Sequence, residues 1–127
     1  MPPQFILSVA AGGAIGSVAR YLVGTWSSKM FINFPCGTLI INVTGSFLIG
    51  LFVGLFATKW DLPQAARIFL IVGICGGYTT FSTFSLDSFR LMERGEALAA
   101  GAYMIGSVVL SLGALIAAML VVRALPN

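Results

Sequence analysis

Residues 76–85, GGYTTFSTFS, concentrate side chains that could hold or guide an ion. Phe81 and Phe84 are three residues apart and would project from the same side of a helix, with Ser82 and Thr83 between them. The edge of an aromatic ring is electropositive, so two rings presented edge-on can line a route for a small anion without a fixed charge that would trap it. Neighbouring hydroxyls would replace water as hydrogen-bond donors. The alternative interpretation is packing, the usual use of aromatic residues at helical spacing.

The same stretch is the part of the chain where a helix is most expected to unwind. Gly76 and Gly77 lower helix propensity, and the β-branched Thr79 and Thr80 follow at once. Inside a membrane, a break is tolerated where the freed backbone lines a cavity or binds an ion. Carbonyls at the break could hold a cation, and the half-helix that follows would present the positive end of its dipole.

Further polar residues in apolar segments are candidates for the same route. Asn42 and Thr38 lie in GTLIINVTGS, and a buried amide must find a partner or serve a pathway. Structural hydrogen bonding between helices is the alternative. Ser111 follows Ser107 by four residues on one helical face, although such hydroxyls often bond back to their own helix. Arg20 could set a positive potential at the mouth of an anion route, or reach the membrane interface.

The sequence offers little for catalysis. It has no histidine and no nucleophile paired with a base, and Asp87 is the only carboxylic acid near the interior of an apolar segment. Asp87 and Arg90, three residues apart, could pair with each other. Cys36 and Cys75 form neither a disulfide nor a metal-ligand pattern. We therefore predict that the protein is not an enzyme, and its 7 Lys and Arg residues are too scattered for a nucleic-acid surface.

Membrane helices must position these groups. Of the 127 residues, 58% are hydrophobic and 9% are charged, and the mean hydropathy is +1.00. Soluble proteins carry about 25% charged residues. The apolar runs are continuous rather than alternating, which favours helices over a β-barrel. The first run lacks a basic flank and is too long for a cleaved signal, so we expect it to be retained.

Four segments are long enough to cross the hydrocarbon of a bilayer, which takes about 20 helical residues. They run over residues 5–26, 37–58, 67–91 with a break at 76–80, and 97–122. Their short links make neighbouring helices antiparallel and put both termini on one side. The predicted fold is an all-α membrane protein, a single four-helix transmembrane domain over residues 1–127.

The charges of the links do not select an orientation. Three basic residues lie on the side opposite the termini and three on the side of the termini; they are Lys29, Arg90 and Arg94, and then Lys59, Arg67 and Arg123. Because the positive-inside rule counts Lys and Arg in short links, this balance gives no preferred direction unless Arg20 is counted as well. It predicts insertion in both directions, unless lipid or a partner fixes one.

Three pairs of glycines are spaced four residues apart, a spacing that allows close approach of helices. They are Gly12 and Gly16, Gly50 and Gly54, and Gly73 and Gly77. Such faces suggest self-association, so we expect a homo-oligomer.

Three stretches of the sequence together resemble the Fluc (CrcB) family of fluoride channels over nearly the whole chain. They are GGAIGSVARY, GTLIINVTGSFLIG and GGYTTFSTFS. The resemblance implies a fluoride-selective ion channel in the bacterial inner membrane that lets fluoride leave the cytoplasm passively. It also implies a dual-topology homodimer, two subunits inserted antiparallel among the membrane lipids, with two pores and one structural sodium ion (Na+) at the dimer centre.

The resemblance further implies roles for particular residues. The fluoride pore would be formed by Asn42, Phe81, Phe84, Ser82, Thr83, Ser111, Thr38 and Arg20. Sodium would be held by the backbone carbonyls of Gly76 and Thr79 from both subunits, and oxygen ligands suit a hard cation. Tyr78 stands where relatives often have an aliphatic residue, and we expect its side chain to point away from the carbonyl site. Asp87 stands where a glutamate is common.

Two other classes of protein stay open. A small dual-topology multidrug exporter would be similar in size, but it predicts a membrane-embedded glutamate in the first helix, where this sequence has Ala and Gly. A non-transporting assembly subunit would leave GGYTTFSTFS without a role. A fluoride-efflux measurement separates these alternatives.

Overall fold

The computed structural model describes residues 1–30 and 32–126, and every regular element in that part of the chain is helical. Four helical spans are long and apolar enough to cross a membrane. They are Pro3–Ser28, Cys36–Thr58, Gln64–Glu93 and Ala97–Ala124. The prediction of an all-α protein with four membrane-spanning helices is therefore confirmed.

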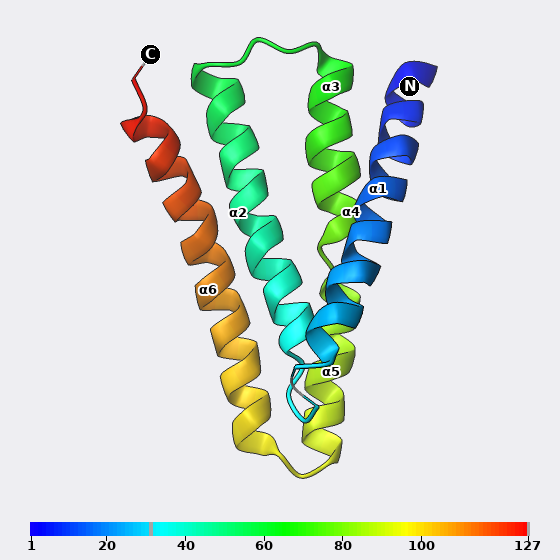
Figure 1. Cartoon of the computed structure of the whole chain (residues 1–127), viewed down its shortest axis with the longest axis vertical. Coiled ribbons are helices and arrows are strands. Elements are labelled where there is room, and N and C mark those ends of the chain that lie inside the picture. Colours follow the sequence, from blue (N-terminus) through cyan, green and yellow to red (C-terminus); the bar gives the residue numbers. More distant parts are fainter. Residues whose placement is uncertain (31, 127) are drawn as a thin grey trace.

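The first, second and fourth spans are each one continuous helix, whereas the third is composite. The continuous helices are α1 (Pro3–Ser28), α2 (Cys36–Thr58) and α6 (Ala97–Ala124). The third span consists of α3 (Gln64–Ile68), the π-helical η1 (Phe69–Cys75), α4 (Gly76–Tyr78) and α5 (Phe81–Glu93). Figure 1 shows both termini and the α2–α3 link at one end of the molecule, and the α5–α6 link at the other.

The spans pack as two pairs that diverge toward the end that holds the termini (Figure 1). Helix α6 packs along α2, and α1 packs along η1 and α4. Glycines permit both contacts: a Cβ added to Gly12 would lie 2.8 Å from the Cα of Gly73, and one added to Gly50 would lie 2.6 Å from the carbonyl oxygen of Leu115. These glycine faces are covered within one chain, so the interpretation that they drive self-association is wrong.

Helical structure is interrupted for two residues between α4 and α5. Thr79 (φ −80°, ψ 158°) and Thr80 (φ −151°, ψ 119°) have extended backbones, a conformation that suits β-branched residues. Gly76 and Gly77 were expected to unwind with them, but both are helical. The reason is packing, because a Cβ on Gly77 would lie 2.9 Å from the carbonyl oxygen of Gly13. This glycine permits contact with α1 rather than a loss of helix.

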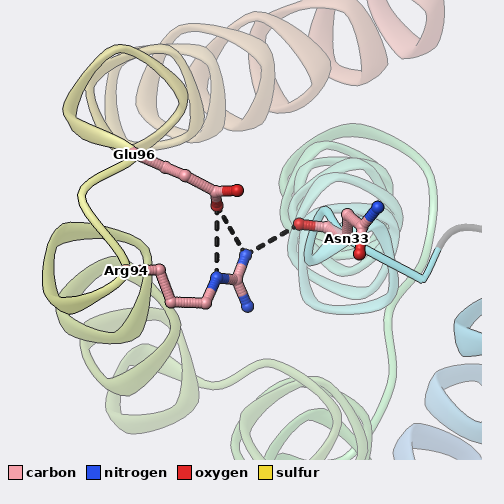
Figure 2. Close-up of polar contacts among 3 residues, drawn as sticks. All are labelled: Asn33, Arg94 and Glu96. Atoms are coloured by element: carbon pink, nitrogen blue, oxygen red, sulfur yellow. Dashed lines mark hydrogen bonds and ion pairs between the residues drawn. The ribbon is translucent and has the colours of Figure 1, made fainter.

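The end opposite the termini is tied together by a small core and by Arg94. Leu91, Ala100 and Tyr103 form a buried apolar cluster where α5 meets α6. Figure 2 shows Arg94 reaching from the α5–α6 link to two groups: its Nη2 donates to Glu96 Oε2 at 2.7 Å and to the backbone carbonyl of Asn33 at 2.9 Å. The links α1–α2 and α5–α6 are thereby held side by side.

Candidate functional site

A cavity of about 360 Å³, called the smaller cavity below, lies beside Thr79 and Thr80 and is bounded by α2, α5 and α6. Its lining combines hydroxyl and amide groups with two aromatic rings. The polar residues are Asn42, Ser46, Thr79, Thr80, Ser107 and Ser111, and the rings are those of Phe81 and Phe84. The predicted pore residues Asn42, Phe81, Phe84 and Ser111 meet here, together with Gly76 and Thr79, which were predicted to bind sodium.

The Asn42 side chain bonds to both backbone groups of Thr80. Its Nδ2 donates to the Thr80 carbonyl at 3.1 Å, and its Oδ1 accepts from the Thr80 N–H at 2.9 Å. A buried backbone that has left its helix needs such partners, because unpaired polar groups are costly in a membrane. Asn42 therefore joins α2 to the extended segment, which agrees with the helix-to-helix alternative. It also lines the cavity that a pore would need.

The two phenylalanines differ in how firmly they are held. Their ring centroids are 5.5 Å apart at an interplanar angle of 39°. The Phe84 ring packs on Tyr103 with centroids 5.3 Å apart, beside the buried cluster of α5 and α6. Phe81 is 78% exposed although it also lines the smaller cavity. One chain alone therefore leaves one side of the ring pair uncovered.

Ser107 is a site residue that the sequence reasoning set aside. It is 6% exposed, and its Oγ is buried with no hydrogen-bond partner among the described residues. It lines the smaller cavity one helical turn before Ser111. Most buried hydroxyls have a partner, whereas the enclosed Oγ of Ser107 has none among the described residues. In the sequence, only the spacing of four residues between Ser107 and Ser111 indicated that the two serines could line the same site.

Gly76 and Thr79 both line the smaller cavity. A Cβ added to Gly76 would meet only the carbonyl oxygen of Ile71, at 3.7 Å, so its surroundings are open. In a continuous helix the Thr80 N–H would bond to the Gly76 carbonyl, but here it donates to Asn42. Backbone oxygens at such a position suit a hard cation such as sodium. In the described part of the chain, no group of three or more His, Cys, Asp or Glu side chains offers another metal site.

A second cavity of about 740 Å³, called the larger cavity, also reaches Thr80. Its polar lining includes three guanidinium groups and one carboxyl group, and Thr80 lines both cavities. The basic residues are Arg20, Arg90 and Arg94, and the acid is Asp87. The predicted pore residues Arg20, Thr38 and Thr83 are found here rather than in the smaller cavity. An excess of positive charge favours an anion in this space.

Hydroxyl groups at the start of α5 form a cluster around Thr80. The Thr80 Oγ1 accepts from the Thr83 backbone N–H and lies 3.2 Å from the hydroxyls of both Ser82 and Thr83. This bond caps the N-terminus of α5. Ser82 is exposed and lines neither of the two cavities. Within this cluster Thr80 lines both cavities, Thr83 lines the larger one, and Ser82 is at the exposed edge.

Asp87 bonds to hydroxyls rather than to Arg90. Its Oδ2 accepts from Thr38 Oγ1 at 2.7 Å and from the Tyr103 hydroxyl at 3.1 Å. The expected Asp87–Arg90 pair is wrong, because these two contacts turn the carboxyl group toward α2 and α6. Ion pairs in the described part of the chain include Arg94–Glu96 and the longer Arg67–Asp61, at 4.0 Å.

The chemistry of the two cavities suits an anion better than a covalent reaction. Hydroxyl and amide side chains and two aromatic rings line the smaller cavity, basic side chains line the larger one, and Thr80 lines both. Covalent chemistry is poorly served, because the acid in the larger cavity is engaged by two hydroxyls and the sequence has no histidine to serve as a base.

Comparisons with known proteins agree on one family. Residues 7–119 match the family model described as CrcB-like protein, Camphor Resistance (CrcB). A protein of Nitrobacter hamburgensis named fluoride-specific ion channel FluC 1 is 73% identical over 122 residues, 95% of this chain and 97% of its own length. The fluoride-specific ion channel FluC of Nitrobacter winogradskyi is 73% identical over 120 residues, 94% of this chain and 95% of its own. The fluoride-specific ion channel FluC of Rhizobium johnstonii is 54% identical over 118 residues, 92% of this chain and 94% of its own length.

Proposed function

The chain belongs to the CrcB family, a family of ion channels rather than enzymes, and we propose that it is a fluoride-selective channel through which fluoride leaves the cytoplasm passively. The protein is a multi-pass membrane protein. The proposal places it in the bacterial inner membrane, where its role is to lower the toxicity of fluoride inside the cell.

The observation that carries the proposal is the smaller cavity. It brings the Phe81 and Phe84 rings together with the unpartnered hydroxyl of Ser107 and with Ser111. Fluoride is small and strongly hydrated, so a pore must offer dense donors to offset the loss of water. Ring edges and hydroxyls supply them without a full charge that would hold the ion in place. The larger chloride ion fits such a narrow arrangement poorly.

The larger cavity is the proposed entrance. Arg20 and Arg90 raise the local concentration of anions there, because charge of one sign in a cleft attracts the opposite ion. The charge of Arg94, by contrast, is paired with Glu96. Thr38 and Thr83 then provide hydroxyls on the way to Thr80. Asn42 has the remaining N–H of its amide for the ion, since one N–H is used on the Thr80 carbonyl.

We further propose that the working channel is a homodimer of two antiparallel subunits with two pores. Phe81 is 78% exposed in one chain, and a second copy would cover it and complete the route. The balanced basic residues of the links support insertion in both directions. Sodium would be bound where the subunits meet, by the carbonyls of Gly76 and Thr79 from each, because two oxygens from one chain are too few for a hard cation.

A small multidrug exporter is the second candidate, and the carboxyl groups of this chain argue against it. Such an exporter uses a protonatable acid at membrane depth. Helix α1 contains no Asp or Glu, and Asp87 accepts hydrogen bonds from Thr38 and Tyr103. Helices α2 and α6 likewise contain no Asp or Glu that could couple transport to protons.

Fluoride efflux from liposomes tests the proposal. Purified protein is reconstituted into vesicles loaded with potassium fluoride, and external fluoride is followed with an electrode after valinomycin is added to balance charge. Fast efflux at equal internal and external pH, with far slower efflux from chloride-loaded vesicles, is expected. Absence of fluoride efflux would contradict the channel, and transport that requires a proton gradient would favour the exporter.

A further inference from the structure

Three consecutive residues at the interruption of the third span are each held by α2. The Tyr78 hydroxyl lies 2.8 Å from Thr44 Oγ1, and both backbone groups of Thr80 bond to the Asn42 amide. Between them, the Thr79 methyl group packs on Gly45 so closely that an added Cβ there would collide with it. The contacts on α2 come from positions 42, 44 and 45, which lie within one helical turn.

The direction of the Tyr78–Thr44 bond follows from the partners of Thr44. Thr44 Oγ1 lies 2.7 Å from the Ile40 carbonyl, the usual acceptor for a threonine hydroxyl four residues later in a helix. Its only hydrogen is therefore used there, and Tyr78 donates to Thr44. Tyr78 is 8% exposed, and its ring lies against Gly45, where an added Cβ would be 3.1 Å from Tyr78 Cδ2. The tyrosine is thus fixed by its ring and by its hydroxyl.

We propose that Tyr78 is a positioning residue: its bond to Thr44, together with Asn42, clamps residues 78–80 to α2 and so sets the direction of the Gly76 and Thr79 carbonyls. A two-residue extended segment has few bonds of its own to define its orientation. The segment lies at the smaller cavity, so a change in its orientation changes the cavity. The sodium and transport readouts rest on the proposed function, whereas the clamp itself does not.

Bound sodium would join carbonyl oxygens and neutralise their repulsion. Gly76 lies two residues before Tyr78 and Thr79 directly follows it, so both proposed ligands are within or close to the clamped segment. A segment that is already oriented loses less freedom when it binds an ion. Removing the Tyr78 hydroxyl should therefore weaken sodium binding without removing any ligand.

The test compares two variants that each remove the hydrogen bond between Tyr78 and Thr44 with one variant that keeps it. Tyr78→Phe and Thr44→Val retain shape and lose the bond, and Thr44→Ser retains the hydroxyl. Thermal unfolding in detergent is followed against sodium at constant ionic strength, with N-methylglucamine as replacement. The sodium concentration for half-maximal stabilisation should rise roughly threefold in Tyr78→Phe and Thr44→Val, the factor typical of one hydrogen bond between membrane helices. Thr44→Ser should match the wild type, and the double variant should shift no further than either single one.

Tyr103→Phe is the matched control, because it removes a tyrosine hydroxyl bonded to Asp87 elsewhere. It should change thermal stability without changing the sodium requirement. An unchanged requirement in both Tyr78→Phe and Thr44→Val, or a rise of the same size in Thr44→Ser, would overturn the proposal.

Hydrogen exchange gives a readout that needs neither sodium nor transport. The Thr80 amide, bonded to Asn42, should exchange at least threefold faster in Tyr78→Phe than in the wild type, because the segment opens more often. If the wild type shows no fluoride flux or no sodium stabilisation, the corresponding part of the proposed function fails and exchange still decides on the clamp. Equal exchange in both proteins would then refute the clamp.

Discussion

Asn42 is the residue on which the extended backbone between α4 and α5 most directly depends. Its amide pairs with the N–H and the carbonyl of Thr80, which is itself 8% exposed. In Asn42→Ala both backbone groups lose their partner, so we expect the free energy of unfolding to fall by about 1–3 kcal/mol. Reversible unfolding in detergent measures this. Thr58→Ala, which removes only an exposed hydroxyl bonded within α2, should cost less than about 0.5 kcal/mol; equal losses would contradict the role of Asn42.

Substitutions of the two phenylalanines proposed to line the pore should separate the effect on fluoride flux from the effect on stability. Phe81→Ile and Phe84→Ile keep bulk and remove ring edges, so each should lower fluoride flux at least about tenfold, a loss of about 1.4 kcal/mol in barrier terms. Phe84→Ile should also lower the free energy of unfolding by about 0.5–1.5 kcal/mol, because it loses the ring contact with Tyr103. Phe89→Ile, an exposed ring on α5 outside both cavities, is the control and should conduct normally. Normal flux in both pore variants would return these rings to a packing role.

For single residues, the sequence identifies candidate site residues but not the residues to which they are hydrogen-bonded. Buried polar side chains in apolar segments stand out from composition alone, which is why Asn42 and the hydroxyls of residues 76–85 could be found. Their partners depend on tertiary packing: Asn42 meets Thr80 across 38 residues, and Thr38 meets Asp87 across 49. The local Asp87–Arg90 pair was the simplest expectation from spacing, and more distant hydroxyls replaced it.

Helix pairing rests on glycines at a few positions, and adjacent glycines of α1 allow a sharp test. A Cβ on Gly12 would collide with the Phe69 carbonyl, whereas one on Gly13 would meet nothing within 4 Å. Gly12→Ala must push α1 away from η1 and should lower the free energy of unfolding by about 2 kcal/mol or more, within the range for overpacking. Gly13→Ala should change it by less than about 0.5 kcal/mol or raise it slightly, since alanine favours helix. Thermal unfolding of the two variants measures the difference. Equal destabilisation by Gly12→Ala and Gly13→Ala would contradict the α1–η1 contact.

The elements themselves were predictable to different degrees. Long apolar runs fix α1, α2 and α6, because a bilayer requires internally hydrogen-bonded helices of that length. The composite third span was harder to predict from the sequence. Threonine propensity correctly marks the extended residues 79 and 80, but Gly76 and Gly77 stay helical. Propensity scales cannot show that Gly77 is needed for contact with Gly13.

At the scale of the whole molecule, the glycine faces that suggested self-association are used inside one chain, so another surface must carry the proposed dimer. The exposed Phe81 beside the smaller cavity is the best candidate for such a surface. Composition and link lengths were enough for four antiparallel spans with both termini at one end (Figure 1). Which subunit surfaces meet cannot be read from hydropathy, because lipid and a second apolar subunit favour the same side chains.

The orientation of the chain provides the last prediction. Substituting Asp61→Lys and Gln64→Lys adds two lysines at the end of the termini, and Met30→Lys with Glu93→Lys adds two at the other end; all four residues are exposed. Each pair should bias insertion in one direction, since short links with more Lys and Arg stay in the cytoplasm. If opposed subunits are needed, each variant alone should conduct at least about tenfold less per protein than the wild type. Co-expression of the two should restore flux, because their opposite insertion supplies both orientations. Protease access to a C-terminal tag reports orientation, and full flux from a population inserted in one direction would rule out the antiparallel dimer.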